Sequence, residues 1–289
     1  MNSKSFPVRL HVLYARDARR ALVIRRDASR YTCVVDWHRD TGAFTISQWF
    51  MGQIYERRSD ISPDGVHWIY FAMNGKWQAE TRGAWTTVAR TPWLKAVSLY
   101  GKGNCRGGGG LFLSNRTFWL NDAFDHFSLF EDTRVHRSQG YHPEQHFGGE
   151  CPHVYYNRLM RDGWTLLKLR EGTDGDLVTW FEKTLSNEWR LRKICHEDAS
   201  FKVSRERYRD EHELLHMDAI IPVTDWEWAD WLDETLVFCR AGGLYRQQLS
   251  ASQTLAEPVL IHDFNPYTYR ERILPLASEG EDDLLSHPL

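Results

Sequence analysis

Short β-forming runs separated by polar turns recur along this 289-residue chain, and this feature restricts its fold more than any other. The runs are rich in aliphatic and aromatic residues and are spaced roughly 8–12 residues apart. The turns contain Gly, Asp and Asn, which accept backbone conformations that other residues avoid. No window of ten or more residues shows convincing helical periodicity, although residues 204–217 come closest. The sequence therefore predicts an all-β protein.

The clearest of these patterns is a predicted hairpin within residues 48–77. Its turn is Ser-Pro-Asp-Gly at residues 62–65, in which proline presets φ and glycine tolerates a positive φ. The dense β-forming run 66–71 follows the turn. Because side chains alternate along a strand, we expect Trp68 and Tyr70 to share one face.

Two further segments repeat this order of polar turn, aromatic-rich strand and second turn: MRDGWTLLKLREG and WADWLDETLVFCRAGGLYRQQL. The hairpin itself, ISPDGVHWIYFAMNGKW, resembles the Ser-Pro-Asp-Gly blades of bacterial propellers related to the TolB family, and the last segment is similar to the inner strands of a generic propeller blade. The resemblance implies a β-propeller. At about 40–50 residues per blade, the length predicts about five blades. Another all-β sandwich or barrel is the alternative.

We predict a single β-rich domain over residues 1–276. Residues 121–150 carry four histidines, several charges and little periodicity, so we expect an irregular insertion there. A strand is predicted to resume at 154–159. The acidic tail 277–289 is predicted to be disordered.

Composition argues against several partner classes. The net charge of −3 and the pI near 6.5 give no electrostatic footprint for nucleic acid or an anionic membrane. No apolar run approaches the roughly 20 residues of a membrane span, and the N-terminus lacks a secretory signal. The five cysteines are widely separated and form no Cys-x-x-Cys pair. We therefore expect a cytoplasmic protein with reduced thiols.

The segment His212-Glu213-Leu214-Leu215-His216 fits the zinc-protease pattern His-Glu-x-x-His. That chemistry requires a helix, which places both histidines on one face within reach of one ion. In a strand the two residues lie about 13 Å apart, at ~3.3 Å per residue. We expect extended structure here and no zinc site. A metal-dependent hydrolase using His212, Glu213 and His216 is the alternative.

Three other groups of residues suggest chemistry less directly. The loop from His142 to His153 contains ligand types that suit zinc or iron, but Pro143 disfavours a helix that would align them. The stretch GKGNCRGGGG at 101–110 lacks the third glycine and the helix of a dinucleotide site, so its glycines are expected to allow close backbone packing. A glycosidase-like hydrolase would use carboxylates at strand ends, namely Asp36, Asp60, Asp64, Glu227 and Asp230.

The chain contains 13 tryptophans, most of which we assign to the core. Tryptophan and arginine are enriched at interface hot spots. We therefore predict a non-enzymatic protein-interaction or binding module that needs no cofactor and has a protein as its partner. The candidate binding residues flank polar turns: Trp37, Trp49, Trp77, Trp93, Arg106, Trp226 and Trp231.

Overall fold

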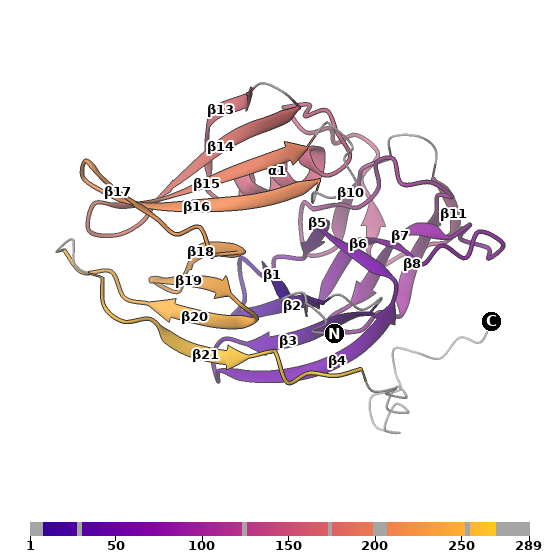
Figure 1. The fold of residues 1–289 in the computed structure, drawn as a ribbon. Helices are drawn as coiled ribbons and strands as arrows, with labels where there is room; N and C mark the ends of the chain where they lie inside the picture. The colour runs from indigo at the N-terminus through magenta and orange to yellow at the C-terminus, as the bar shows by residue number, and fades with distance from the viewer. Residues whose placement is uncertain are drawn as a thin grey trace, which may run out of the picture.

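The computed structural model describes residues 8–27, 31–122, 126–172, 175–198, 207–251 and 255–269, and these residues form 21 strands and one helix (Figure 1). The all-β prediction is confirmed. The predicted tail 277–289 lies outside the described residues, and the single domain over 1–276 stays a prediction. Within the described ranges, no helix is long and apolar enough to cross a membrane.

The strands form five sheets that follow the order of the chain. Sheet 1 contains β1 (Arg9–Tyr14), β2 (Arg20–Arg26), β3 (Tyr31–His38) and β4 (Ala43–Met51). Sheet 2 contains β5 (Gln53–Ile61), β6 (His67–Met73), β7 (Ala84–Arg90), β8 (Ala96–Gly101) and, on its far edge, β11 (Phe127–Phe130). Sheet 3 contains β9 (Gly110–Phe112), β10 (Thr117–Leu120) and β12 (His136–Arg137).

The second half of the chain builds the other two sheets. Sheet 4 contains β13 (Thr165–Glu171), β14 (Asp176–Thr184), β15 (Trp189–Asp198), β16 (Tyr208–His216) and β17 (Ala219–Pro222). Sheet 5 contains β18 (Trp228–Leu232), β19 (Thr235–Arg240), β20 (Gly243–Gln247) and β21 (Val259–Asp263). Neighbouring strands are antiparallel in all five sheets except for the parallel pair β10 and β12.

Sheet 1 is buried on both faces. Along β2, Ala21 and Val23 pack against residues of sheet 5, whereas Leu22 and Ile24 pack against residues of sheet 2. Strands buried on both faces read as continuous apolar runs, which explains the sequence Ala-Leu-Val-Ile at 21–24. Sheet 2 is covered in the same way, by sheet 1 on one face and by sheet 3 on the other.

The predicted hairpin is formed by β5 and β6. Gly65 has φ +73°, and its amide donates to the carbonyl of Ser62 at 2.9 Å, which closes the turn. Trp68 and Tyr70 share a face as predicted, with ring centroids 4.0 Å apart. The start of the segment differs from the prediction, because residues 48–51 belong to β4 in sheet 1 and the chain changes sheet at Gly52.

The strand predicted at 154–159 is wrong, because this segment lies in the helix α1 (Pro152–Arg161). Valine and two tyrosines favour a strand locally. However, Pro152 occupies the first turn, where proline suits a helix, and the helix ends at Asp162, before Gly163. Packing of α1 against sheets 3, 4 and 5 decides the outcome.

Two loop predictions can be compared with the structure. In the glycine-rich stretch, a side chain at Gly109 would place its Cβ 1.9 Å from the carbonyl oxygen of Arg58, so the predicted close packing is confirmed. The described part of 121–150 is mostly irregular, and its two short strands extend sheets 2 and 3.

Candidate functional site

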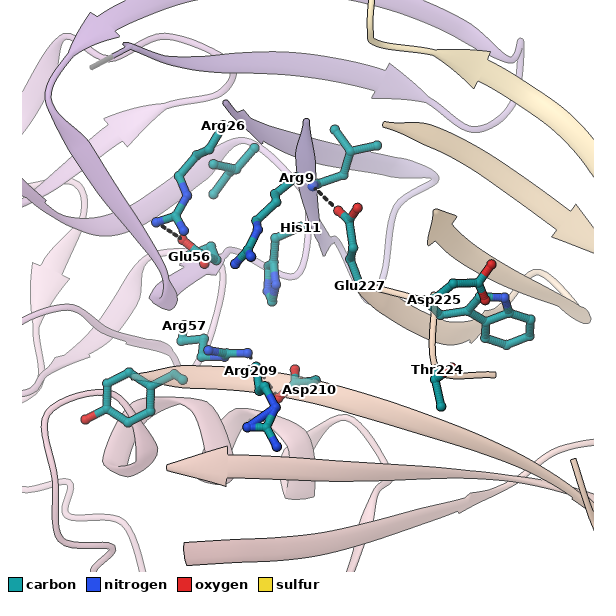
Figure 2. A pocket seen from close by; sticks show the side chains of 14 residues that line it. Arg9, His11, Arg26, Glu56, Arg57, Arg209, Asp210, Thr224, Asp225 and Glu227 are labelled. Atoms are coloured by element: carbon teal, nitrogen blue, oxygen red, sulfur yellow. Dashed lines mark hydrogen bonds and ion pairs between the residues drawn. The ribbon is translucent and has the colours of Figure 1, made fainter. Parts of the chain in front are cut away.

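A pocket with a volume of about 270 Å³ lies where residues of sheets 1, 2 and 4 meet the loop that precedes β18 (Figure 2). Most of its lining is charged, and we call it the charged pocket. The lining residues are Arg9, Leu10, His11, Ile24, Arg26, Glu56, Arg57, Tyr208, Arg209, Asp210, Thr224, Asp225, Trp226 and Glu227.

Strand geometry explains how β1 and β5 supply polar side chains. On β1, Arg9 and His11 are two residues apart and therefore lie on the same side of the strand. On β5, the pairing with β6 is irregular between Tyr55 and Asp60, which interrupts the alternation. The adjacent residues Glu56 and Arg57 both line the pocket as a result.

Asp210 on β16 anchors one wall of the charged pocket. Its Oδ1 lies 3.1 Å from Nη2 of Arg57, and its Oδ2 accepts a hydrogen bond of 2.6 Å from the hydroxyl of Tyr155. Although burial alone would raise the pKa of Asp210, the charges of Arg57 and Lys193 hold that pKa well below its usual range. The carboxylate is therefore ionised at neutral pH.

His11 lies buried at the base of the charged pocket. Nη2 of Arg158 on α1 donates to Nε2 of His11 at 2.8 Å, so this ring nitrogen is an acceptor. Burial, together with the positive charges of Arg158 and Arg57, lowers the pKa of His11 well below its ordinary value. The imidazole is neutral, and its surroundings have a positive potential.

Two more carboxylates line the pocket. Glu56 lies 3.3 Å from Nη1 of Arg26, and Oε2 of Glu227 accepts a hydrogen bond of 2.8 Å from the backbone amide of Leu10. Burial raises the pKa of Glu227 although this hydrogen bond opposes the shift.

A second cavity of about 20 Å³ lies between β1, β5, α1, β15 and β18. Its lining includes Tyr14, Asp60, Tyr155, Arg158, Lys193 and Asp230. A cavity of this size holds about one water molecule. Arg158 and Lys193 are both at least 95 % buried, and no carboxylate lies within ion-pair distance of either among the described residues. Carboxylates act on both cations from a greater distance, Asp60 on Arg158 and Asp210 on Lys193.

The His-Glu-x-x-His segment forms part of strand β16, so the predicted extended structure is confirmed. His212 lies with Nδ1 3.0 Å from the carbonyl of Trp226 and with Nε2 3.0 Å from Nζ of Lys193. His216 packs against Trp189, with ring centroids 4.5 Å apart. Burial and the charge of Lys193 lower the pKa of His212 to about 3. This geometry lacks the helix that the zinc-hydrolase alternative requires.

The histidine-rich loop brings only some of its candidate ligands together. The rings of His146 and His153 are 4.4 Å apart, and burial lowers the pKa of His153 to about 4. Among the residues that the structure describes, no group of three or more His, Cys, Asp or Glu side chains is placed to hold a metal ion.

Two of the five carboxylates considered for a glycosidase, Asp60 and Asp230, line the cavity of about 20 Å³ together, and each is held in an ion pair. Asp36 pairs with Arg20, at 2.8 and 2.7 Å. Asp60 pairs with Arg161, with one contact of 2.9 Å, and Asp230 pairs with Lys183. Asp64 accepts hydrogen bonds inside the turn before β6, and only Glu227 of the five lines the charged pocket.

The seven predicted binding residues do not gather at one place. Only Trp226 lines the charged pocket, where its side chain is buried. Trp37 is buried in the core between sheets 1 and 5, and Trp49, Trp93 and Trp231 are half-buried. Trp77 and Arg106 are exposed.

Comparisons with protein-family models, with curated proteins and with solved structures found no match. The charged pocket therefore has to be interpreted from its own geometry. Its main residues, Arg9, His11, Arg57 and Asp210, were not singled out from the sequence. The available signal was the presence of charged residues inside β-forming runs, such as Glu-Arg-Arg-Ser-Asp at 56–60.

Proposed function

We propose that this protein is a non-enzymatic protein-binding module and that its partner places an acidic side chain in the charged pocket. The observation that carries this proposal is the convergence of Arg9 and Arg57 on the neutral His11. In Figure 2 the side chains of Arg9 and His11 extend from β1 toward Arg57. An arginine fork binds a carboxylate through two parallel hydrogen bonds, and arginine is enriched at interface hot spots.

Near His11 the electrostatics favour an anionic group, whereas the pocket lining as a whole carries four arginines and four carboxylates. Burial and the neighbouring charge of Arg26 lower the pKa of Arg9. The same kind of repulsion, from Arg158 and Arg57, adds to burial in keeping His11 neutral. A carboxylate that enters this region would relieve the repulsion among the cations, because its attraction is strongest where solvent is excluded.

The size of the pocket supports a side chain as its occupant. At about 270 Å³ the pocket is slightly smaller than the roughly 300–1,000 Å³ that is typical of small-molecule sites. Trp226 contributes an aromatic wall, which suits the aliphatic part of a glutamate. The exposed Trp77 and Arg106 remain predicted contacts for other parts of the partner.

The proposed scaffold is a β-propeller with five blades. The packing supports it, because sheet 1 lies between sheets 5 and 2, and sheet 2 lies between sheets 1 and 3. Helix α1 packs against sheet 3 and against sheets 4 and 5. A sandwich needs only two facing sheets, so this succession favours a propeller. A cytoplasmic location is part of the same proposal.

Binding of a short acetylated and amidated glutamate peptide, measured by calorimetry, tests the proposed function. We expect the glutamate peptide to bind more tightly than a glutamine peptide of the same length, and Arg9→Ala to weaken that binding by about tenfold. Arg246→Ala is the matched control, because Arg246 is exposed on β20 and does not line the pocket. Equal binding of both peptides, or equal losses in both variants, would contradict the proposal.

A further inference from the structure

A buried arginine contacts two cysteines at the edge of sheet 2. Arg58 on β5 is fully buried, and its Nε donates to Sγ of Cys151 at 3.3 Å. Nη1 of the same guanidinium donates to the carbonyl oxygen of Cys105 at 2.6 Å and to that of Gly107 at 2.7 Å. Cys105 and Cys151, which lie 47 and 93 positions after Arg58 in the sequence, therefore both contact its planar guanidinium group.

Glu150 completes this cluster. Its Oε2 accepts from Nη2 of Arg58 at 3.0 Å and from Nη1 of Arg207 at 3.3 Å. Its Oε1 accepts from the thiol of Cys105 at 3.6 Å. One carboxylate therefore contacts two guanidinium groups and the Cys105 thiol.

Two features distinguish the surroundings of Cys151. The first is the hydrogen bond that its sulfur accepts from Arg58. The second is position, because Cys151 is the N-cap residue of the ten-residue helix α1 and its side chain caps no backbone amide. Cys105, in contrast, is exposed and lies beside a carboxylate that can accept its proton.

We propose that Cys105 and Cys151 form a dithiol site that a hydroperoxide oxidises to a disulfide. Glu150 takes the proton of the Cys105 thiol, and the resulting thiolate attacks the peroxide oxygen, which gives a sulfenic acid and, with that proton, releases water or an alcohol. The Cys151 thiolate then attacks the Cys105 sulfur. Hydroxide leaves and takes up the proton that Cys151 has lost. In total, two thiols and one peroxide give one disulfide and two molecules of water, or one of water and one of alcohol.

The remaining cysteines provide internal controls. Cys33, Cys195 and Cys239 are buried in the cores of the sheets. Burial raises the pKa of the thiols of Cys195 and Cys239 well above the ordinary value, so both are protonated and unreactive. No disulfide joins any of the five cysteines, all of which lie in the described part of the chain.

The full-length protein is treated with one equivalent of hydrogen peroxide at neutral pH, alkylated, digested without reduction and analysed by mass spectrometry. We expect a peptide pair linked through Cys105 and Cys151, with a mass two hydrogen atoms lower than the sum of the two reduced peptides. A thiol reductant should separate the two peptides again. Glu150→Gln should slow its formation by about 100-fold, because the base is lost. Cys239→Ser, the matched control, should leave the rate unchanged.

Cys105→Ser should abolish the linked peptide and leave Cys151 reduced, because the peroxide reacts at Cys105. Circular dichroism of each variant establishes that it is folded. The proposal is overturned if Cys105 is oxidised to the sulfinic acid, or links two chains, while the Cys151 thiol stays intact. An unchanged rate in folded Glu150→Gln overturns it as well.

Discussion

Nη2 of Arg158 donates a hydrogen bond of 2.8 Å to Nε2 of His11, which joins helix α1 to strand β1 across 147 positions of sequence. Arg158 also donates to the backbone carbonyls of Glu56 and Ser59 on β5. The helix therefore fixes the base of the charged pocket from beneath. Because the guanidinium is a donor only, the contact requires a neutral imidazole at His11.

The buried histidines make stability dependent on pH. His11 and His212 have pKa values below the ordinary 6.5, and that of His212 is about 3. The unfolded chain therefore binds these protons at a higher pH than the folded chain does. The stabilisation is present above pH 6.5 and is lost as the pH falls from there toward the folded pKa, by about 1.4 kcal/mol per pH unit for each histidine.

Urea unfolding at several pH values between 7 and 4 measures this dependence. We expect His212→Gln to be less stable than the wild type at pH 7. Its free energy of unfolding should fall less steeply as the pH is lowered, because the variant takes up about one proton fewer on unfolding. If the free energy of unfolding depends on pH with the same slope in both proteins, His212 takes up its proton without unfolding.

The glycine-rich loop should tolerate no side chain at Gly109. This residue has φ +75°, and a Cβ would lie 1.9 Å from the carbonyl oxygen of Arg58. We expect Gly109→Ala to lower the free energy of unfolding by about 2 kcal/mol or more. Gly140→Ala is the control, because a Cβ at Gly140 meets nothing within 4 Å. Similar denaturant midpoints for the two variants would contradict the described packing.

Loss of the ion pair between Asp60 and Arg161 should strongly lower the free energy of unfolding. Asp60 is 1 % exposed and also accepts a hydrogen bond of 2.7 Å from the amide of Phe112. Asp60→Asn would remove one of the two charge partners of Arg161, which also pairs with Asp162 at 2.8 Å, at an expected cost of about 3 kcal/mol. Asp40→Asn removes an exposed pair with Arg19 and should cost about 1 kcal/mol or less. Thermal unfolding of both variants checks this, and equal costs would refute it.

Local pattern was sufficient to predict most of the strands. The turn of the hairpin at Gly65 followed from turn chemistry, and the extended structure of 212–216 was expected although residues 204–217 come closest to a helical period. Helix α1 could not be predicted in this way, because Val154, Tyr155 and Tyr156 favour a strand and only their tertiary contacts favour a helix. The clue that did exist was Pro152 at the first turn.

The charged pocket depends on relationships that a single sequence does not contain. Arg57 and Asp210 form an ion pair although 153 positions separate them, and the irregular pairing of β5 directs Arg57 into the pocket. Tryptophan content indicated binding residues, but burial depends on which sheet covers each ring. Trp37 is covered by sheet 5, whereas Trp77 is 52 % exposed.

A structure of the protein in complex with the glutamate peptide tests the central claim most directly. We predict a peptide carboxylate within hydrogen-bond distance of the guanidinium of Arg9 or Arg57, with the peptide chain lying beside Trp226. A peptide bound at a different surface, with the charged pocket unchanged and without a carboxylate in it, would contradict the proposed function.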